Sequence, residues 1–305
     1  MLKTNICGVR LSNPTVLASG IVGVTAASLI NAADNGAGAV TTKSISINER
    51  KGHTAPVILS TKSFTINAVG LSNAGIEDSL PEIEFAVRHS KSPVIASIFA
   101  NKINDFGILA ERISTVKPQL IEVNISCPNV DAEFGKPFSI DPDAAAEVTA
   151  KVKENTKIPV IIKLSPNVLD IKLIAKAVEE AGADAITAIN TLGPGMSIDI
   201  RTKMPILSNK FGGISGPAIK PIAVKAVYDI YQTVKIPIIG TGGINNAEDA
   251  LEMMMAGASA IGIGSGVYYE GIEVFKKVTD DMEKFMKKEG YSSLKDIIGA
   301  AHNVR

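Results

Sequence analysis

The fold class that the sequence predicts is α/β, in the form of a TIM or (β/α)8 barrel that occupies residues 1–305 as a single domain. Two recurring patterns predict it. Three short β-branched runs directly follow a proline, which is typical of parallel strands buried on both faces. Three further runs begin with glycine and alanine, as expected where a helix ends and a strand begins. The proline-led runs are 92–97, 158–163 and 236–241, and the glycine-led runs are 36–43, 182–189 and 257–264.

Two more apolar runs, 15–18 and 120–125, bring the number of candidate strands to eight. Apolar residues at three- and four-residue spacing predict helices between them. The clearest of these helices cover 141–155, 170–181, 217–233 and 247–256. A chain of 305 residues suits one barrel with modest insertions, and no linker rich in proline, glycine and serine divides it. An open, doubly wound sheet is the alternative fold.

One insertion stands out, because the segment 46–79 is too long for a plain loop between a strand and a helix. Apolar and polar residues alternate in its part 56–64, and this alternation is typical of a half-buried strand. We therefore expect a small hairpin over the C-terminal mouth of the barrel, where the ends of the parallel strands meet.

The composition excludes several classes of function. There are 31 basic and 31 acidic residues, so no overall charge favours binding to nucleic acid or to a membrane surface. The first residues lack the apolar region of a signal peptide, and no apolar run approaches the roughly 18 residues of a membrane span, so we expect a cytoplasmic protein. Two cysteines and three scattered histidines predict no metal site and no disulfide framework. We interpret Cys7 as a small buried apolar residue and expect surface roles for His89 and His302.

Polar residues or glycines follow every predicted strand at its C-terminal end, which is where barrel enzymes carry their chemistry. Any one of them could be a turn or capping residue, but eight such ends together indicate a site. These residues are Ser19, Lys43, Ser44, Ser97, Asn124 through Asn129, Lys163, Asn190, Thr191, Gly242, Gly243, Gly264 and Ser265.

Three of these features point to particular ligands. The glycine clusters 240–244 and 262–266 suit a barrel phosphate site better than a Rossmann dinucleotide site, whose glycine spacing and acidic residue are missing. Lys163 ends an apolar strand, so its ammonium needs an anion or an electron-rich ligand unless it reaches solvent. Lys43 invites the same argument, and the two lysines together predict an anionic ligand. Cys127, flanked by asparagines, is a candidate nucleophile or base.

The chain resembles the dihydroorotate dehydrogenases almost from end to end. The resemblance is carried by the separate motifs 42–44, 67–73, 124–129, 189–192 and 212–217. It implies an FMN-binding barrel that oxidises (S)-dihydroorotate to orotate in de novo pyrimidine biosynthesis. Cysteine rather than serine at position 127 points to the class 1 enzymes.

The resemblance also implies the roles of individual residues. Cys127 would be the catalytic base, and a thiol with an ordinary pKa of about 8.5 needs only a modest depression for that role. Lys163 would lie near N1 and O2 of the flavin, and Ser97 stands where an asparagine is commonly seen. The implied substrate-binding residues are Lys43, Asn67, Ala68, Val69, Gly70, Leu71, Asn129, Asn190 and Thr191. The implied flavin-binding residues are Ser19, Lys43, Ser44, Ser97, Asn124, Lys163, Ile189, Gly216, Gly242, Gly243, Gly264 and Ser265.

The segment 190–199 is similar to the NAD-linked class 1B enzymes. That subclass implies a catalytic subunit, in a homodimer joined by an electron-transfer subunit that carries FAD and a 2Fe-2S cluster. Two cysteines, one of them assigned to catalysis, cannot ligate such a cluster in this chain. The alternatives are a fumarate-using class 1A enzyme, a flavin-dependent enzyme related to dihydropyrimidine dehydrogenase, a Schiff-base aldolase using Lys163, and a non-catalytic phosphate-binding barrel.

Overall fold

The computed structural model describes residues 1–126 and 138–303, and within them the predicted barrel is confirmed. Eight parallel strands close on themselves, and each pairs with the strands that precede and follow it in the barrel, so the open-sheet alternative is wrong. All eight lie at the predicted positions. They are β3 (Thr15–Leu17), β4 (Ala39–Thr41), β7 (Val94–Ile98), β8 (Leu120–Asn124), β9 (Val160–Leu164), β10 (Ala185–Ala188), β15 (Ile238–Thr241) and β16 (Ala260–Ile263).

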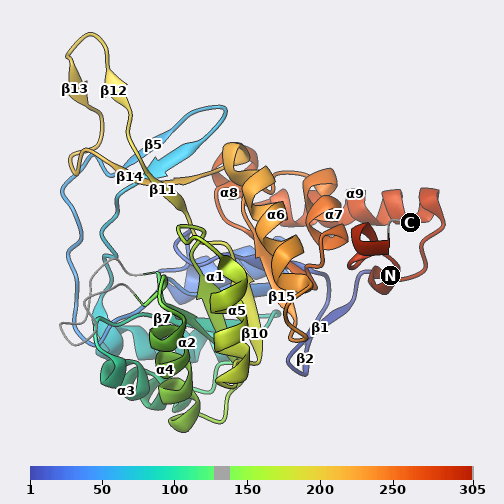
Figure 1. The fold of residues 1–305 in the computed structure, drawn as a ribbon, viewed down its shortest axis with the longest axis horizontal. Helices are drawn as coiled ribbons and strands as arrows, with labels where there is room; N and C mark the ends of the chain where they lie inside the picture. The colour runs from blue at the N-terminus through green and yellow to red at the C-terminus, as the bar shows by residue number, and fades with distance from the viewer. Residues whose placement is uncertain (127–137, 304–305) are drawn as a thin grey trace.

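Helices surround the barrel and cover the outer faces of its strands (Figure 1). The four predicted helices are present, although the one expected at 217–233 opens with the short 3₁₀ helix η1 (Pro217–Ile219). None of the helices in the described ranges is both long and apolar enough to cross a membrane. The α-helices are α1 (Ala26–Asp34), α2 (Gly75–His89), α3 (Ile103–Ser114), α4 (Pro142–Glu154), α5 (Ile171–Glu180), α6 (Lys220–Tyr231), α7 (Ala247–Met255), α8 (Gly266–Glu270) and α9 (Val274–Glu289).

The N-terminal end of the barrel interior is closed by a hairpin made of β1 (Thr4–Ile6) and β2 (Val9–Leu11). Ile6 and Leu11 are buried in one apolar cluster with side chains from all eight barrel strands. Cys7 lies at the turn of this hairpin, where its thiol donates to the carbonyl of Asp184 at 3.2 Å. It is therefore half-buried rather than a core residue, and burial raises the pKa of its thiol to about 12.

The opposite end carries a four-stranded sheet made from two segments far apart in the sequence. The predicted hairpin is confirmed as β5 (Ile58–Ser60) and β6 (Thr65–Asn67). Beside it lie β11 (Leu192–Gly195) and β14 (Gly212–Ser215), which belong to an insertion after β10 that the sequence did not predict. Since β11 starts four residues after β10 ends, the sheet stands at the C-terminal mouth. A second hairpin, β12 (Ile198–Asp199) and β13 (Met204–Pro205), projects beyond it (Figure 1).

The C-terminal part of the described chain is held by His302, in the 3₁₀ helix η3 (Ala300–Asn303). Its ring stacks on Tyr228 with centroids 3.9 Å apart, and its Nε2 lies 3.0 Å from the carbonyl oxygen of Ala256. The expectation of a surface role for His302 was therefore wrong, because the stacked ring packs the tail against α6. His89 is exposed, as predicted.

Candidate active site at the barrel mouth

A buried carboxylate lies at the centre of the barrel interior, two residues beyond its apolar end. Glu122 of β8 accepts hydrogen bonds from the hydroxyls of Ser97 and Thr187, each at 3.1 Å. The Lys163 ammonium lies 3.6 Å from the Oε1 atom of Glu122, and the two side chains are 7% and 5% exposed. Sequence reasoning missed Glu122, although an acidic residue inside an otherwise apolar strand was the signal that could have found it.

This pair changes the interpretation of Lys163. The alternative in which it reaches solvent is wrong, since its side chain is buried. Its charge is balanced by Glu122 within the fold, so Lys163 alone does not require an external anion. The 3.6 Å separation is too long for a hydrogen bond, which leaves the donors of the ammonium available to a ligand.

Above Glu122, the predicted residues of five strand ends form one hydrogen-bonded chain. Ser44 lies 3.1 Å from Ser19 and 2.9 Å from Ser97, measured between hydroxyl oxygens. Asn124 donates to Ser44 at 3.5 Å, and Asn190 donates to Asn124 at 3.3 Å. The structure therefore brings these predicted residues together, and it engages the Ser97 hydroxyl with Ser44 and Glu122.

Lys43, just after β4, is the other predicted lysine, and its situation differs from that of Lys163. Its ammonium donates to the Ser72 hydroxyl at 3.4 Å, and no carboxylate pairs with it among the described residues. Burial lowers the pKa of Lys43, because desolvation disfavours its charged form. A half-buried ammonium with one long hydroxyl contact can accept an anion at little cost, so the prediction of an anionic ligand now rests on Lys43.

The predicted segment Asn67 to Leu71 forms the loop that leaves β6. Gly70 and Leu71 have left-handed backbones, with φ of 74° and 56°. The loop is fastened at both sides, because the backbone N–H of His53 donates to the Val69 carbonyl and Lys43 contacts Ser72. It is thus fixed beside the end of β4, where its backbone and the Asn67 amide can meet the same ligand as Lys43.

The glycine turn after β15 shows features of an anion site. Gly243 has a left-handed backbone, with φ of 75°, and a Cβ there would lie 2.6 Å from the Lys220 Cβ and 3.0 Å from the Gly216 carbonyl oxygen. The predicted residues Gly216 and Gly243 are therefore close neighbours. The buried side-chain oxygens of Thr241 and Asn245 have no hydrogen-bond partner. Such unsatisfied polar atoms are uncommon in proteins and indicate a ligand here.

The turn is held in place by Asp249, near the start of α7. Its carboxylate accepts from the Lys220 ammonium at 2.7 Å and from the backbone N–H of Asn245 at 3.0 Å. Within the described ranges, the hydrogen bonds include no acceptor for the backbone N–H of Gly243 or Ser265. These donors, with Gly242 and Gly264 beside them, suit a phosphate group.

Two predicted residues, the proposed base Cys127 and Asn129, lie outside the described residues. Ile189 is buried directly after β10, and its backbone N–H donates to the Thr241 carbonyl at 2.9 Å, which joins the ends of β10 and β15. Within the described ranges, no group of three or more histidine, cysteine and acidic residues could hold a metal ion.

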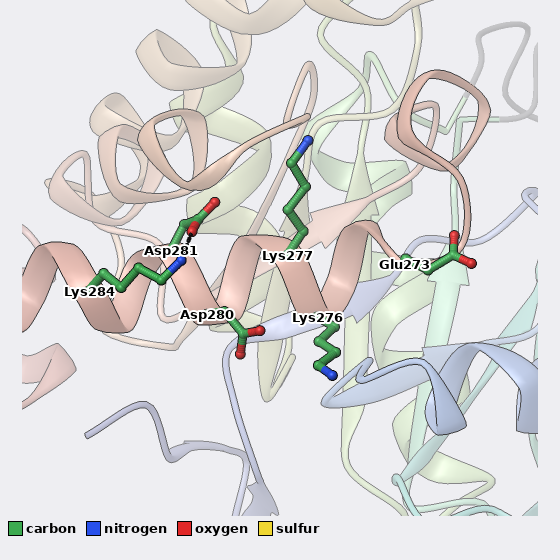
Figure 2. Close-up of a pocket in the computed structure, with 6 residues that line it drawn as sticks. All are labelled: Glu273, Lys276, Lys277, Asp280, Asp281 and Lys284. Atoms are coloured by element: carbon green, nitrogen blue, oxygen red, sulfur yellow. Dashed lines mark hydrogen bonds and ion pairs between the residues drawn. The ribbon is translucent and has the colours of Figure 1, made fainter.

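A hollow elsewhere on the molecule, of about 290 Å³, follows helix α9 (Figure 2). Two of its lysines form ion pairs, Lys284 with Asp281 at 2.8 Å and Lys277 with Glu270 at 2.7 Å. Because its lysines are exposed and two of them are already paired, we do not regard it as a binding site. The lining residues are Glu273, Lys276, Lys277, Asp280, Asp281 and Lys284.

The fold and the polar residues at the C-terminal mouth define the class as an α/β barrel enzyme. Comparison with known proteins makes this specific, since the family model for dihydroorotate dehydrogenase matches residues 1–286. The chain belongs to the dihydroorotate dehydrogenase family and is an oxidoreductase, so the aldolase and the non-catalytic barrel are excluded.

Curated relatives of similar length share nearly half of the sequence. The chain is 48% identical, over 99% of its length and 98% of the relative's, to the catalytic subunit of dihydroorotate dehydrogenase B (NAD(+)) of Methanocaldococcus jannaschii. Relatives with the same description from Methanothermobacter thermautotrophicus and Pyrococcus abyssi are 45% and 46% identical, over 99% and 100% of this chain and of their own lengths. These matches favour the NAD-linked subclass over the fumarate-using one.

A solved structure confirms the barrel fold. The structure of dihydroorotate dehydrogenase from Eimeria tenella in complex with ferulenol superposes with a TM-score of 0.84. The match covers 99% of this chain and 89% of that one, at 22% sequence identity.

Proposed function

We propose that this chain is the catalytic subunit of an NAD-linked dihydroorotate dehydrogenase, in which bound FMN accepts a hydride from (S)-dihydroorotate. The observation that carries the proposal, together with family membership, is the half-buried Lys43 ammonium, which has no carboxylate partner among the described residues. Dihydroorotate carries a carboxylate, whereas the uracil and thymine handled by dihydropyrimidine dehydrogenases do not. Lys43 therefore favours the acid substrate.

The residues present fit FMN. Its phosphate would lie at the turns of Gly216, Gly242, Gly243, Gly264 and Ser265, and the unpartnered oxygens of Thr241 and Asn245 and the N–H groups of Gly243 and Ser265 nearby support this position. Its ring system would face the residues at the C-terminal ends of the strands, which are Ser19, Ser44, Ser97, Asn124, Lys163 and Ile189. When bound, FMN supplies the hydride acceptor.

The pyrimidine would be held between Lys43 and the loop from Asn67 to Leu71. Asn190 and Thr191 at the end of β10, together with Asn129, supply amide and hydroxyl groups that match the carbonyl and N–H edge of the ring. These contacts would contribute to catalysis by orienting the pyrimidine ring against the flavin, because hydride transfer requires C6 to lie close to the hydride acceptor. Cys127 would remove the proton from C5 as its thiolate.

The electrons would leave through a second protein. The chain has no Rossmann fingerprint for a dinucleotide, and its two cysteines are too few to ligate a 2Fe-2S cluster. We therefore assign FAD, the 2Fe-2S cluster and the NAD site to a partner subunit. We further propose a homodimer, which the projecting β12–β13 hairpin supports. Its apolar side chains Ile198, Ile200 and Met204 are 55%, 87% and 64% exposed, as expected of a surface covered by another chain. We place the assembly in the cytoplasm.

An anaerobic reductive half-reaction tests the cofactor, the substrate and the chemistry together. Purified protein loaded with FMN is mixed with dihydroorotate, and the flavin absorbance is recorded. We expect the flavin to bleach with dihydroorotate and not with dihydrouracil, which lacks the carboxylate. Protein that takes up no FMN, or flavin that bleaches equally with both compounds, would contradict the proposal.

A comparison of electron acceptors tests the partner requirement. The isolated chain should reduce artificial dyes with dihydroorotate and should give little NADH. Rapid NAD reduction by the isolated chain, at the rate of the dye assay, would exclude the need for a partner.

A further inference from the structure

Glu122 is a buried charged residue just below the mouth that the proposed function does not use. It lies in β8 and faces the barrel interior, where its partners Ser97, Lys163 and Thr187 come from β7, β9 and β10. A single carboxylate thus joins four consecutive strands. Its side chain is 5% exposed, so its charge is held inside the fold rather than at the surface.

Stability alone is a weak reason to keep such a pair. Burying two charges costs desolvation free energy that their attraction and hydrogen bonds only offset, and apolar side chains of similar volume are often as stabilising. The apolar end of the same interior shows that this barrel can be filled that way, with Leu120 and Ile161 at the positions two residues earlier in the same strands. The position of the charge therefore points to a role in the site.

The geometry of Lys163 indicates what that role is. Its ammonium is held 3.6 Å from the carboxylate, close enough for strong attraction and too far for a hydrogen bond. Lys163 is paired in register with Asn124 and Thr187, so it lies level with the last polar residue of β8, at the mouth. Glu122 lies two residues deeper, behind it. The carboxylate thus fixes the ammonium from below, and the N–H donors stay free on the side of the ligand.

We infer that Glu122 is a positioning residue that acts through Lys163: it attracts the ammonium from below and offsets part of the positive charge that Lys163 presents to the FMN ring, and so lowers the midpoint potential of the bound flavin. This inference rests on the proposed function, since it requires FMN at the mouth. Reduction places negative charge on the flavin, and the positive charge of Lys163 favours it. The negative charge of Glu122 opposes part of that effect. Removing it should make the flavin easier to reduce.

The test measures the midpoint potential of FMN in the holoenzyme by anaerobic titration against a reference dye, from pH 6 to pH 9. In Glu122→Gln, which keeps the shape and hydrogen-bonding capacity of the side chain, the potential should rise. We expect reduced FMN to gain about tenfold in affinity relative to oxidised FMN, which corresponds to about 30 mV for a two-electron couple. An unchanged or lower potential at every pH would overturn the inference.

Further variants separate this role from a structural one. Glu122→Asp withdraws the carboxylate from Lys163 and should raise the potential by a smaller amount, so it decides the question if the glutamine variant does not fold. Thr187→Val removes one hydrogen bond to Glu122 but no charge, and it should not raise the potential. In a Lys163→Met background the ammonium through which Glu122 acts is removed, so Glu122→Gln should then have almost no effect. A full rise in that background would contradict action through Lys163.

FMN uptake and reduction by dihydroorotate in the wild-type protein distinguish a failure of the proposed function from a failure of the role proposed for Glu122. If it takes up no FMN, the proposed function fails and this inference fails with it. If it takes up FMN and is reduced by dihydroorotate, while both Glu122 variants keep its potential, only the role of Glu122 is overturned.

Discussion

The two ends of the barrel interior are built from the same strands but from different kinds of side chain. At the N-terminal end, Leu120, Ile161 and Ala185 pack against the β1–β2 hairpin in an apolar cluster. Two residues further along the same strands, Glu122, Lys163 and Thr187 form the buried polar layer. Side chains two residues apart face the same side of a strand, so the change takes place within one pleat. The apolar end of each strand therefore contributes mainly to stability, and the polar end contributes to the proposed site. Substitutions at the apolar end should lower the free energy of unfolding, whereas those at the polar end should lower activity.

The largest effect should come from Cys127→Ser, which removes the proposed base. A serine hydroxyl is a much weaker base than a thiolate, so flavin reduction should slow by about 10²- to 10⁴-fold, as is typical when a general base is lost. The affinity for FMN and orotate and the melting temperature should stay near those of the wild type. Stopped-flow reduction at rising pH checks this, because part of the rate should return. An unchanged rate would remove Cys127 from the mechanism.

Lys43→Met should have the next largest effect. Removing one partner of a buried charge pair costs about 3–5 kcal/mol, so kcat/KM for dihydroorotate should fall by at least roughly 10²-fold. Ser72→Ala is the matched control, since it removes only the 3.4 Å contact to Lys43, and it should cost less than tenfold. Orotate binding, followed by the shift of flavin absorbance, checks both variants. Equal losses in the two would mean that the charge of Lys43 is not what binds the acid.

At the apolar end, Leu120→Ala should reduce stability and leave the chemistry alone. Leu120 is fully buried, so the cavity should lower the free energy of unfolding by about 2–5 kcal/mol. Ile161→Val, in the same cluster, should cost about 0.5–1.5 kcal/mol. Denaturant unfolding gives these values. The rate of flavin reduction in the folded variants should stay within about twofold of the wild type; a larger loss would show that the two ends are coupled.

The smallest effect is a pH dependence of substrate binding. Burial lowers the pKa of Lys43, so its ammonium loses its proton at a lower pH than an exposed lysine does. Binding of the substrate carboxylate should therefore be flat near neutrality and should weaken as the pH rises through the lowered pKa. The KM for dihydroorotate, measured at increasing alkaline pH, should rise severalfold in the wild type. It should show no such rise in Lys43→Met.

The comparison also explains what the sequence predicts well. The barrel strands are recognisable because proline-led and glycine-led β-branched runs are local features, and the residues at their C-terminal ends follow directly from the fold. Glu122 was not predicted, because its partners Ser97, Lys163 and Thr187 lie 25, 41 and 65 residues away in the sequence. Only the closed barrel brings them together.

The second insertion at the mouth was missed for another reason. The strands β11 and β14 contain the glycine-rich stretches Leu192–Gly195 and Gly212–Ser215, which carry no β-branched pattern. They are strands because β6 supplies hydrogen-bond partners from a segment about 150 residues earlier, as in the pairing of Ser215 with Thr65. Tertiary pairing, rather than local preference, determines them.

The hairpin of β1 and β2 covers the N-terminal end of the barrel, where Ile6 and Leu11 pack against side chains from all eight strands, so this end is closed to ligands. Substrate and product must therefore enter and leave through the same opening, at the C-terminal mouth. The oxidised product has to dissociate before the next substrate molecule can bind. The first eleven residues thereby help to restrict ligand exchange to the opposite end of the barrel.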